Sequence, residues 1–420
     1  MNEMVQAINF IIGTLFTVCF AYQFIYILIA LFKKEKAHGP EKMHRYAILI
    51  SARNEENVIG HLLESIHAQD YPAELIKVFV AADNCTDRTA ECARAAGAEV
   101  FERFNTVRVG KGYALNELIR YIHGAYGEDY FDGYFIFDAD NLLEPNYVSE
   151  MNRTFSDGYQ VVTGYRNSKN YGENWISSGY ALWFLRESQF LNRARMVSGF
   201  SCGVSGTGFL FSREVLKRYG GWNFFLLTED IEFTVNNILD GEKIGYCSKA
   251  MLYDEQPVRF SQSWRQRMRW AKGYLQVFKK YGGRLMGRCI ARRDFSCFDF
   301  SMCILPLFTL TAIGMLFNGV MMILGALMGR EITVALGSLL YSLASSYLTL
   351  FGMGLITLIS EWKRIRASAW RKCLLLFTFP LFQMTYIPIS CCALFVNVEW
   401  KPIEHRMSVS MKELNQQSSL

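Results

Sequence analysis

Two aspartates separated by a single residue, Asp138 and Asp140, form the first group whose side chains could do chemistry. A short apolar run precedes them, so a strand ending there would present both carboxylates together. Mg²⁺ binds one or two carboxylates along with phosphate oxygens, so this pair could hold a divalent cation against a diphosphate. A solvated turn is the competing interpretation, because Asp is common in turns.

Two further clusters suit a nucleotide and its phosphates. Asp83, in the stretch Asp-Asn-Cys-Thr-Asp, could accept hydrogen bonds from a base or a ribose, while Asp87 in the same stretch is equally suited to cap a helix. Lys111 stands between two glycines at the start of a helical segment, where backbone N–H groups and the lysine charge favour phosphate. A plain turn is the alternative there, because the other positions of a Walker motif are missing.

The last two clusters lie further along the chain. In Thr228-Glu229-Asp230, a carboxylate could serve as a general base, although a helix N-cap with acidic residues in its first turn is the alternative. Gln266, Arg269 and Trp270 have the spacing of one helix face and could clamp a diphosphate and stack on a sugar. A basic helix at a membrane surface is the competing interpretation for this stretch.

The segment that positions the first clusters alternates between strand and helix signals. Strands are predicted at 46–52, 76–82, 99–101 and 134–137, with helices at 54–69, 86–96 and 111–123. Such alternation predicts an α/β fold with a parallel sheet covered by helices on both faces. Ligands of such sheets bind beyond the carboxyl ends of the strands. Residues 53–56, 83–87 and 138–140 each follow a predicted strand, so we expect them to meet there.

Four runs contain no charged residue and are each long enough to cross a membrane: 4–32, 303–328, 332–360 and 373–398. About 20 helical residues span the hydrocarbon core, where every backbone polar group must be paired within the protein. The fourth run contains Pro380 and Pro388, so a broken or re-entrant helix is the alternative there. We therefore predict a multi-pass protein of the cell membrane.

Basic residues are distributed unevenly around these runs. They follow the first run (Lys33, Lys34, Lys36) and fill the loop between the third and fourth, which places segment 33–302 on the cytosolic side. Residues 256–293 carry eleven Lys or Arg and no Asp or Glu, with aromatics interleaved. Nucleic-acid binding is one interpretation. The adjacent membrane run favours an interfacial helix on anionic lipid, so we expect membrane lipid and no nucleic acid as a partner.

These observations divide the chain into five parts. We predict an N-terminal transmembrane anchor at 1–32, a cytosolic catalytic domain at 33–258 and basic interfacial helices at 259–300. Three transmembrane segments at 301–398 and a tail at 399–420 complete the chain.

The order of the motifs resembles the processive family 2 glycosyltransferases, which include cellulose, chitin, hyaluronan and poly-N-acetylglucosamine synthases. The resemblance covers roughly residues 46–275 and the flanking membrane pattern. It implies an α/β fold of the Rossmann-like GT-A type joined to transmembrane α-helices. It also implies inverting transfer of a sugar from a nucleotide-sugar donor, UDP-GlcNAc or UDP-glucose, to a growing polysaccharide.

The resemblance also implies roles for individual residues. Asp230 is expected to be the catalytic base, Asp140 and Asp138 the ligands of Mg²⁺ or Mn²⁺, and Trp270 and Glu229 contacts of the acceptor. The donor-binding residues are expected to be Glu55, Asp83, Lys111, Asp138, Gln266 and Arg269.

The sequence also departs from the larger members of that family. Ala82 stands where many relatives carry a second aspartate, and four apolar runs are fewer than hyaluronan and cellulose synthases have. No gating-loop motif follows Trp270. Two alternatives therefore stay open: transfer of a single sugar to a lipid acceptor, and an inactive membrane scaffold of a synthase complex.

Overall fold

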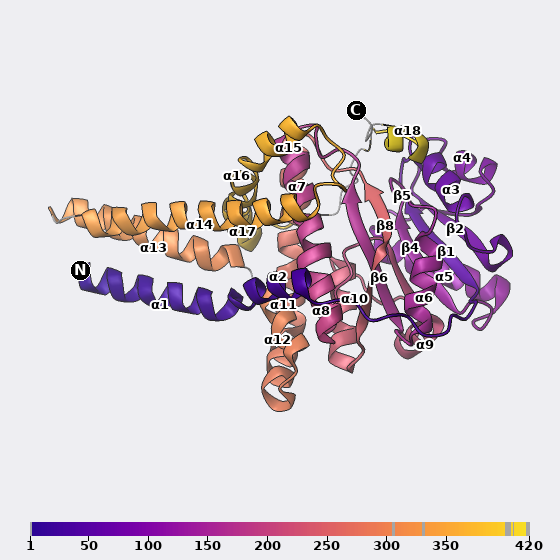
Figure 1. Cartoon of the computed structure of the whole chain (residues 1–420), viewed down its shortest axis with the longest axis horizontal. Helices are drawn as coiled ribbons and strands as arrows, with labels where there is room; N and C mark the ends of the chain where they lie inside the picture. Colours follow the sequence, from indigo (N-terminus) through magenta and orange to yellow (C-terminus); the bar gives the residue numbers. More distant parts are fainter. Residues whose placement is uncertain (1, 305–306, 330–331, 400–404, 406, 417–420) are drawn as a thin grey trace.

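The computed structural model describes residues 2–304, 307–329, 332–399, 405 and 407–416. Within these residues, a domain built on one eight-stranded sheet carries a group of long helices that project from one side (Figure 1). The strand order is β3-β2-β1-β4-β7-β6-β8-β5.

The four strands predicted from the first half of the sequence form a parallel block of this sheet. β1 pairs with β2 on one side and with β4 on the other, and β2 pairs with β3. Their apolar side chains are largely buried, as expected for strands covered on both faces. The bounds are β1 (Tyr46–Ala52), β2 (Ile76–Asp83), β3 (Glu99–Arg103) and β4 (Gly133–Asp138), which confirms the predicted strands.

The second half of the domain makes the sheet mixed. β7 runs antiparallel to both β4 and β6, β6 and β8 are parallel, and β5 is antiparallel to β8. The first four strands, β6 and β8 therefore run in the expected common direction, while β5 and β7 run in the opposite direction. The additional strands are β5 (Leu142–Leu143), β6 (Val161–Ser168), β7 (Phe209–Ser212) and β8 (Ile244–Asp254).

Helices pack on both faces of the sheet and close two apolar cores. Leu118 of α5 and Leu182 of α7 belong to one core, and Leu62 of α3 and Met151 of α6 belong to the other. The helices of this domain are α3 (Ile59–His67), α4 (Thr89–Ala95), α5 (Lys111–Tyr126), α6 (Tyr147–Ser156), α7 (Trp175–Arg186), α8 (Arg193–Ser198), α9 (Arg213–Tyr219) and α10 (Glu229–Asp240), with a 3₁₀ turn at Ala73–Leu75 and a π-helical stretch at Glu187–Asn192.

The helix predicted from residue 54 begins later, at Ile59. The backbone of Asn54 has φ 57°, in the left-handed region, so the chain turns there instead of entering a helix. The backbone N–H of Glu55 donates to Thr89 Oγ1 (2.8 Å), which ties this loop to the start of α4. The residues after β1 are therefore held as a loop at the edge of the sheet, where side chains can face a ligand.

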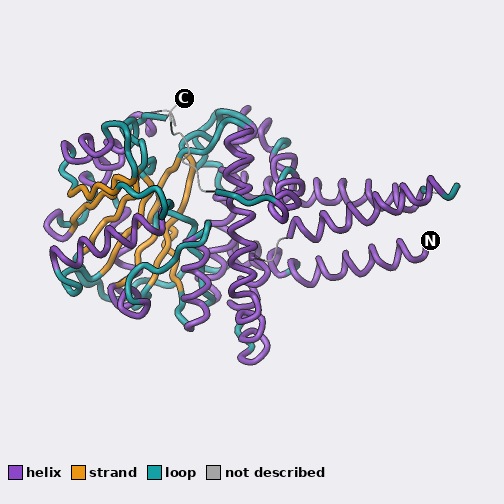
Figure 2. The backbone as a smooth tube through the Cα atoms, turned by 180° about the vertical axis from the view of Figure 1, so that it is seen from behind, coloured by secondary structure: helices purple, strands orange, loops and turns teal. Residues whose placement is uncertain are grey.

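Within the described part of the chain, two helices are long and apolar enough to cross a membrane: Asn2–Phe32, which includes α1 (Asn2–Phe20) and α2 (Tyr22–Phe32), and α14 (Thr333–Ser360). In Figures 1 and 2, α1, α13 (Leu307–Leu327) and α14 project together from the sheet domain. Exposed side chains such as Phe10, Leu316 and Leu348 cover their outer faces, as contact with lipid requires.

The fourth apolar run is broken, which is the alternative that its prolines left open. α15 (Ala369–Leu376) and the stretch Phe379–Phe395 are bent by 43° at a short break, and they count as a third span only if the pair is taken as one. Pro380 begins the second part of the pair. That part consists of α16 (Phe379–Met384) and α17 (Tyr386–Phe395). The second run is divided between α12 (Phe295–Ile304) and α13, with residues 305–306 outside the described residues.

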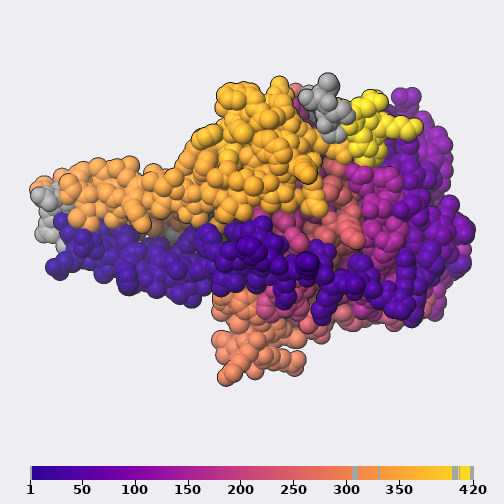
Figure 3. All heavy atoms as spheres, in the orientation of Figure 1, coloured from indigo at the N-terminus to yellow at the C-terminus, as the bar shows by residue number. Residues whose placement is uncertain are grey.

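The end of the described chain returns to the sheet domain. Helix α18 (Met411–Gln416) buries Leu414 against Leu142 of β5 and Tyr253 of β8. Figure 3 shows this yellow segment resting on the domain, far from the projecting tips of α1 and α14. The C-terminal segment thereby joins the sheet domain.

A buried carboxylate joins the apolar helices α2 and α12 to the sheet domain. Asp299 of α12 accepts two hydrogen bonds from the Arg195 guanidinium of α8, both 2.8 Å. Its oxygens also accept from the hydroxyls of Tyr22 (2.9 Å) and Tyr26 (2.7 Å) of α2. The side chains of Arg195 and Asp299 are almost completely buried, so the pair is shielded from water. One side chain therefore connects three helices.

We expect Asp299→Ala to destabilise the protein by about 3–5 kcal/mol, because it leaves the charge of Arg195 buried without a carboxylate. The thermal unfolding midpoint of the protein in detergent, followed by intrinsic fluorescence, should fall. Asp240→Ala, at an exposed carboxylate that accepts from Tyr219, is the matched control and should change the midpoint little. An unchanged midpoint in Asp299→Ala would contradict the role of this junction.

Candidate functional site

A cavity of about 1000 Å³ opens beyond the carboxyl ends of β1, β2 and β4 and continues between the projecting helices. Side chains from the sheet domain, the long helix α11 (Phe260–Arg292) and the C-terminal segment all line it. Every site residue predicted from the sequence is among them: Glu55, Asp83, Lys111, Asp138, Asp140, Glu229, Asp230, Gln266, Arg269 and Trp270. The structure thus brings together residues that lie up to 215 positions apart, from Glu55 to Trp270.

The loops after β1 and β2 hold one another in place. Asn84 has φ 53°, and its side chain donates to the carbonyl of Asn105 (3.0 Å). The Asn54 side chain accepts from the backbone N–H of Thr86 (2.8 Å). Asp87 accepts from the backbone N–H and hydroxyl of Thr89 (3.0 and 2.6 Å). Asp87 is therefore bound within the loop, which favours the structural interpretation of this residue.

Asp83 is held by a buried ion pair. Arg103 Nη1 donates to Asp83 Oδ1 at 2.6 Å, and both side chains are almost fully buried. Arg103 Nη2 also lies 3.0 Å from Glu117 Oε1. Burial raises the pKa of Asp83 despite the guanidinium beside it. The carboxyl group is therefore fixed in orientation, and a nucleoside could reach it only from the cavity.

Lys111 bridges two parts of the site. Its ammonium group pairs with Asp138 and donates to the carbonyl of Gly206 (2.7 Å). The glycines on either side of Lys111 allow the backbone to place its side chain there. Gly110 has φ 131°, and a Cβ at Gly112 would lie 2.2 Å from the carbonyl oxygen of Phe224. The start of α5 can therefore approach the loop before α10, with its N–H groups and the Lys111 charge near the cavity.

Asp140 is buried and carries a negative charge. Its Oδ2 accepts from the backbone N–H of Glu255 (2.8 Å). Burial would raise the pKa of Asp140, but His405 and Lys169 outweigh it and hold this pKa below its usual value. His405 Nδ1 lies 3.0 Å from both carboxylate oxygens of Glu55, and Nε2 lies 4.0 Å from Asp140. Burial would lower the pKa of His405, but these carboxylates raise it to about 10.

The aspartates suit a divalent cation that binds together with a diphosphate. Among the residues that the structure describes, no three His, Cys, Asp or Glu side chains form a metal-binding group. Mg²⁺ needs only one or two carboxylates when phosphate oxygens supply further ligands. The ionised Asp140 and the partly exposed Asp138 fit this requirement.

Glu229 and Asp230 form a coupled acidic pair at the start of α10. Burial raises the pKa of Asp230, and burial together with the Asp230 charge raises the pKa of Glu229 to about 7. Thr228 occupies the N-cap position of α10, but its hydroxyl makes no capping hydrogen bond. A Cβ on Gly206 would lie 3.6 Å from Asp230 Oδ2, so Gly206 is next to this carboxylate as well as to Lys111.

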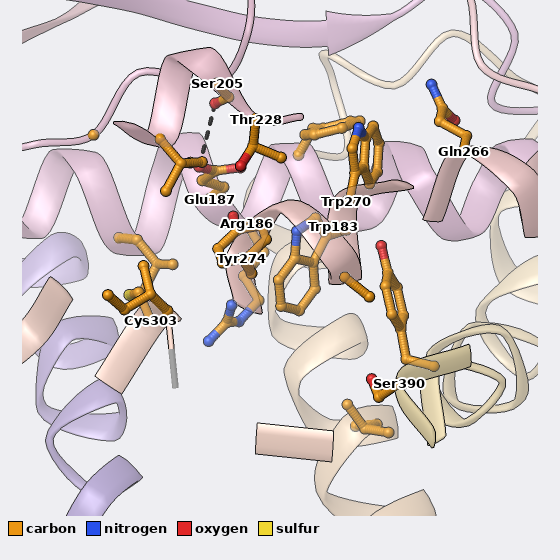
Figure 4. Close-up of a pocket in the computed structure, with 18 of the residues that line it drawn as sticks. Trp183, Arg186, Glu187, Ser205, Thr228, Gln266, Trp270, Tyr274, Cys303 and Ser390 are labelled. Carbon is orange, nitrogen blue, oxygen red and sulfur yellow. Dashed lines mark hydrogen bonds between the residues drawn. The ribbon is translucent and has the colours of Figure 1, made fainter. Parts of the chain in front are cut away.

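Helix α11 supplies the other side of the cavity (Figure 4). Arg269 donates to the carbonyl of Leu227 (2.7 Å), which ties α11 to the loop before α10. The Trp270 ring contacts Tyr180 and Phe184 edge-on, with centroids 5.7 and 6.2 Å apart. Gln266, Arg269 and Trp270 thus share one helix face, as predicted, and that face lines the cavity.

The cavity also has residues that the sequence analysis did not identify. His405 comes from the segment after the last apolar run, where nothing in the local sequence marks it as part of a site. Arg166 of β6 pairs with Asp254 and donates to the carbonyl of Ser205 (2.9 Å). Glu187 accepts from the Ser205 hydroxyl (3.2 Å). Arg166 and Glu187 lie in stretches that read as ordinary strand and helix.

Comparison with known proteins agrees with these features. The sequence matches the family model described as glycosyltransferase like family 2 over residues 44–273, more than half of the chain. A beta-monoglucosyldiacylglycerol synthase of Synechocystis sp. is 27% identical over 240 residues, which is 56% of this chain and 48% of that protein. A poly-beta-1,6-N-acetyl-D-glucosamine synthase of Staphylococcus epidermidis is 24% identical over 241 residues, 56% of each chain.

The chain spans about half the length of these curated relatives. Among solved structures, a mannosyltransferase of Pyrobaculum calidifontis in complex with GDP-Man and Mn²⁺ aligns with 91% of this chain and 99% of its own. The TM-score is 0.53 at 18% sequence identity, so this likeness concerns the fold. The mixed sheet and the family match together show that the chain belongs to the family 2 glycosyltransferases and has a GT-A fold.

Proposed function

We propose that this protein is an inverting membrane hexosyltransferase that transfers a sugar from UDP-GlcNAc or UDP-glucose to a growing polysaccharide. The observation that carries the proposal is the arrangement around Gly206. Lys111, which pairs with Asp138, donates to the carbonyl of this glycine, and Asp230 lies beside the same glycine, within one cavity. A sugar diphosphate bound at Lys111 would have its anomeric carbon near Asp230.

The transfer follows from these positions. An acceptor hydroxyl attacks the anomeric carbon from the face opposite the diphosphate. A new C–O bond forms, the bond to the diphosphate breaks, and the hydroxyl proton passes to Asp230. Lys111 and Arg269 stabilise the negative charge that develops on the leaving nucleoside diphosphate. Mg²⁺ or Mn²⁺ held by Asp140 and Asp138 would supply further positive charge to the diphosphate.

The remaining donor contacts follow from the same placement. Asp83 would receive the nucleoside, and Glu55 and Gln266 would border the diphosphate. Trp270 and Glu229 would face the acceptor. The pairing of Glu55 with His405 adds that histidine to the donor side of the cavity.

The membrane arrangement is part of this proposal. We infer a multi-pass protein of the cell membrane with its sheet domain in the cytosol, and with α11 on anionic lipid. Support comes from the apolar helices and from the basic residues that follow Phe32 and surround Glu361. Membrane lipid then surrounds the apolar helices, and nucleic acid is not a partner.

The acceptor is the least constrained part of the function. Where the cavity passes α14, its lining includes the hydroxyl-bearing Ser338, Ser342, Ser345 and Thr349, which suits a polar saccharide chain. Single-sugar transfer to a lipid is the second candidate, because Phe16 and Phe20 of α1 line the same space. The relatives include enzymes named for each kind of product. The size of the product made by the purified enzyme separates the two.

We expect Asp230→Asn to lower the rate of sugar transfer by about 10²- to 10⁴-fold, because an amide cannot accept the proton of the acceptor hydroxyl. Affinity for UDP should stay close to that of the wild type, since Asp230 lies on the acceptor side of Gly206. Radiolabelled sugar transfer and UDP titration measure the two quantities. Turnover near the wild-type level in this variant would refute the assignment of the base.

We expect kcat/KM to rise as pH increases through the range in which the pair of Glu229 and Asp230 loses its protons. Burial raises the pKa of Asp230, and below that pKa the base is protonated and cannot act. Glu229, with a pKa of about 7, titrates as part of the same pair. Glu229→Gln removes the repulsion between the two carboxylates and should move the acidic limb of the profile to lower pH. An acidic limb that stays in place would show that the pair does not control the rate.

We expect EDTA to suppress transfer, and Mg²⁺ or Mn²⁺ to restore it. Asp140→Ala should abolish the response to added metal, because the buried ligand is lost. The unfolding midpoint in EDTA serves as the control, since it separates loss of metal from loss of fold. Full activity in excess EDTA would exclude the cation from the reaction.

A further inference from the structure

The wall of the cavity beside Asp230 contains side chains that no step above uses. Trp183 and Arg186 end helix α7, and Glu187 begins the π-helical stretch that follows. Figure 4 shows Trp183, Arg186, Glu187 and Thr228 around the same space as Trp270. All of them line the cavity. This wall therefore faces whatever occupies the acceptor side of the site.

Two buried polar atoms on this wall have no hydrogen-bond partner among the described residues. They are Oγ1 of Thr228 and Nε of Arg186, whose residues are 3% and 5% exposed. Leaving a buried donor or hydroxyl unpaired is costly, so a polar occupant would stabilise this wall. Arg186 Nε–H needs an acceptor, while the Thr228 hydroxyl can donate or accept. A hydroxyl-rich molecule meets both requirements.

Glu187 adds an acceptor of hydroxyl protons to the same wall. Ser205 Oγ donates to it at 3.2 Å, and this bond is the dashed line in Figure 4. The Glu187 side chain is partly exposed and lines the cavity. π-helical turns of this kind occur often at functional sites, where they change the direction of a side chain. The carboxylate is thus held in one orientation toward the cavity.

Two indole rings complete the wall. Trp183 and Trp270 both pack against the aromatic cluster of Tyr180, Phe184 and Phe382, and both reach the cavity. The Arg186 guanidinium carbon lies 5.1 Å from the centroid of the Trp183 ring. Flat aromatic surfaces next to hydrogen-bond donors and acceptors match a sugar ring, which has apolar faces and hydroxyl groups at its edges.

We infer that Trp183, Arg186, Glu187 and Thr228 form a subsite for the terminal sugar ring of the acceptor. The inference rests on the proposed function and specifies its class of acceptor. That acceptor ends in a sugar, as a saccharide or a glycolipid does, and is not a simple lipid alcohol. One hydroxyl of the bound ring loses its proton to Asp230 and forms the new bond as the nucleoside diphosphate leaves. A site built to hydrogen-bond hydroxyls rejects an acceptor that lacks them, because its own polar groups are then left unpaired.

The test compares acceptors and variants of the full-length protein in detergent. The acceptors are cellobiose, chitobiose, a monoglucosyl lipid and dioleoylglycerol, each offered with radiolabelled UDP-glucose and UDP-GlcNAc. We expect at least one sugar-ended acceptor to be used in preference to dioleoylglycerol. Glu187→Gln and Trp183→Ala should each raise the KM for that acceptor by about 10- to 100-fold. Their affinity for UDP should remain that of the wild type.

Matched controls separate this subsite from general damage. Glu64→Gln and Trp370→Ala change exposed residues of the same types and should leave the acceptor KM unchanged. Trp183→Phe keeps an aromatic surface and should raise the KM less than Trp183→Ala. The unfolding midpoint of each variant excludes loss of fold.

An acceptor KM that does not change in Glu187→Gln and Trp183→Ala would overturn the inference while the proposed function stands. A preference for dioleoylglycerol would overturn the inference together with the polysaccharide acceptor, and would favour single-sugar transfer to a lipid. Absence of any sugar transfer or donor hydrolysis by the wild-type protein, with all of these donors and acceptors, would instead contradict the proposed function itself.

Discussion

The balance of charge in one cavity is the constraint on which the site depends. Carboxylates from β1, β2, β4 and α10 converge there, and unpaired they would repel one another at short range. The four carboxylates that follow or end these strands, Glu55, Asp83, Asp138 and Asp140, are each close to a particular cation. Arg103 holds Asp83, Lys111 holds Asp138, and His405 lies between Glu55 and Asp140. The acidic pair of α10 has no such ion pair among the described contacts, and its pKa values are raised accordingly.

This difference separates two kinds of carboxylate in the same space. Asp140 is kept ionised, as a ligand for a cation and a diphosphate must be. Asp230 is kept closer to neutrality, where a group can both take up and release a proton. Gly206 is next to Asp230, and its carbonyl accepts from Lys111, which pairs with Asp138. The assigned roles therefore follow from environment as well as from residue type.

Much of this arrangement could be predicted from the sequence. The apolar runs at 46–52 and 76–82 have no other reasonable structure than buried strands, and clusters that follow parallel strands must meet at one edge. The family resemblance then placed Asp230 and Trp270 in the same site, although the strand pattern alone does not. The two prolines of the fourth run made a broken helix an alternative there, and the chain does bend in that run.

Other features depend on contacts that local sequence does not encode. β7 is only four residues long, and its antiparallel entry beside β4 is decided by packing. Glu187 faces the cavity because of a π-helical turn inside an otherwise helical stretch. His405 reaches Glu55 across 350 positions, and a single histidine in a polar tail carries no periodic or spacing signal.

The contact between His405 and Glu55 has a consequence for how the pocket comes into being. The sheet is finished once β8 has been made, yet α11, the bent helix pair and the returning tail are synthesised afterwards. The cavity therefore gains its last wall only after the chain of the apolar helices has been made. A sheet domain cut free at residue 258 would lose Gln266, Arg269, Trp270 and His405, all of which line the cavity. The complete cavity thus depends on chain that follows the whole sheet.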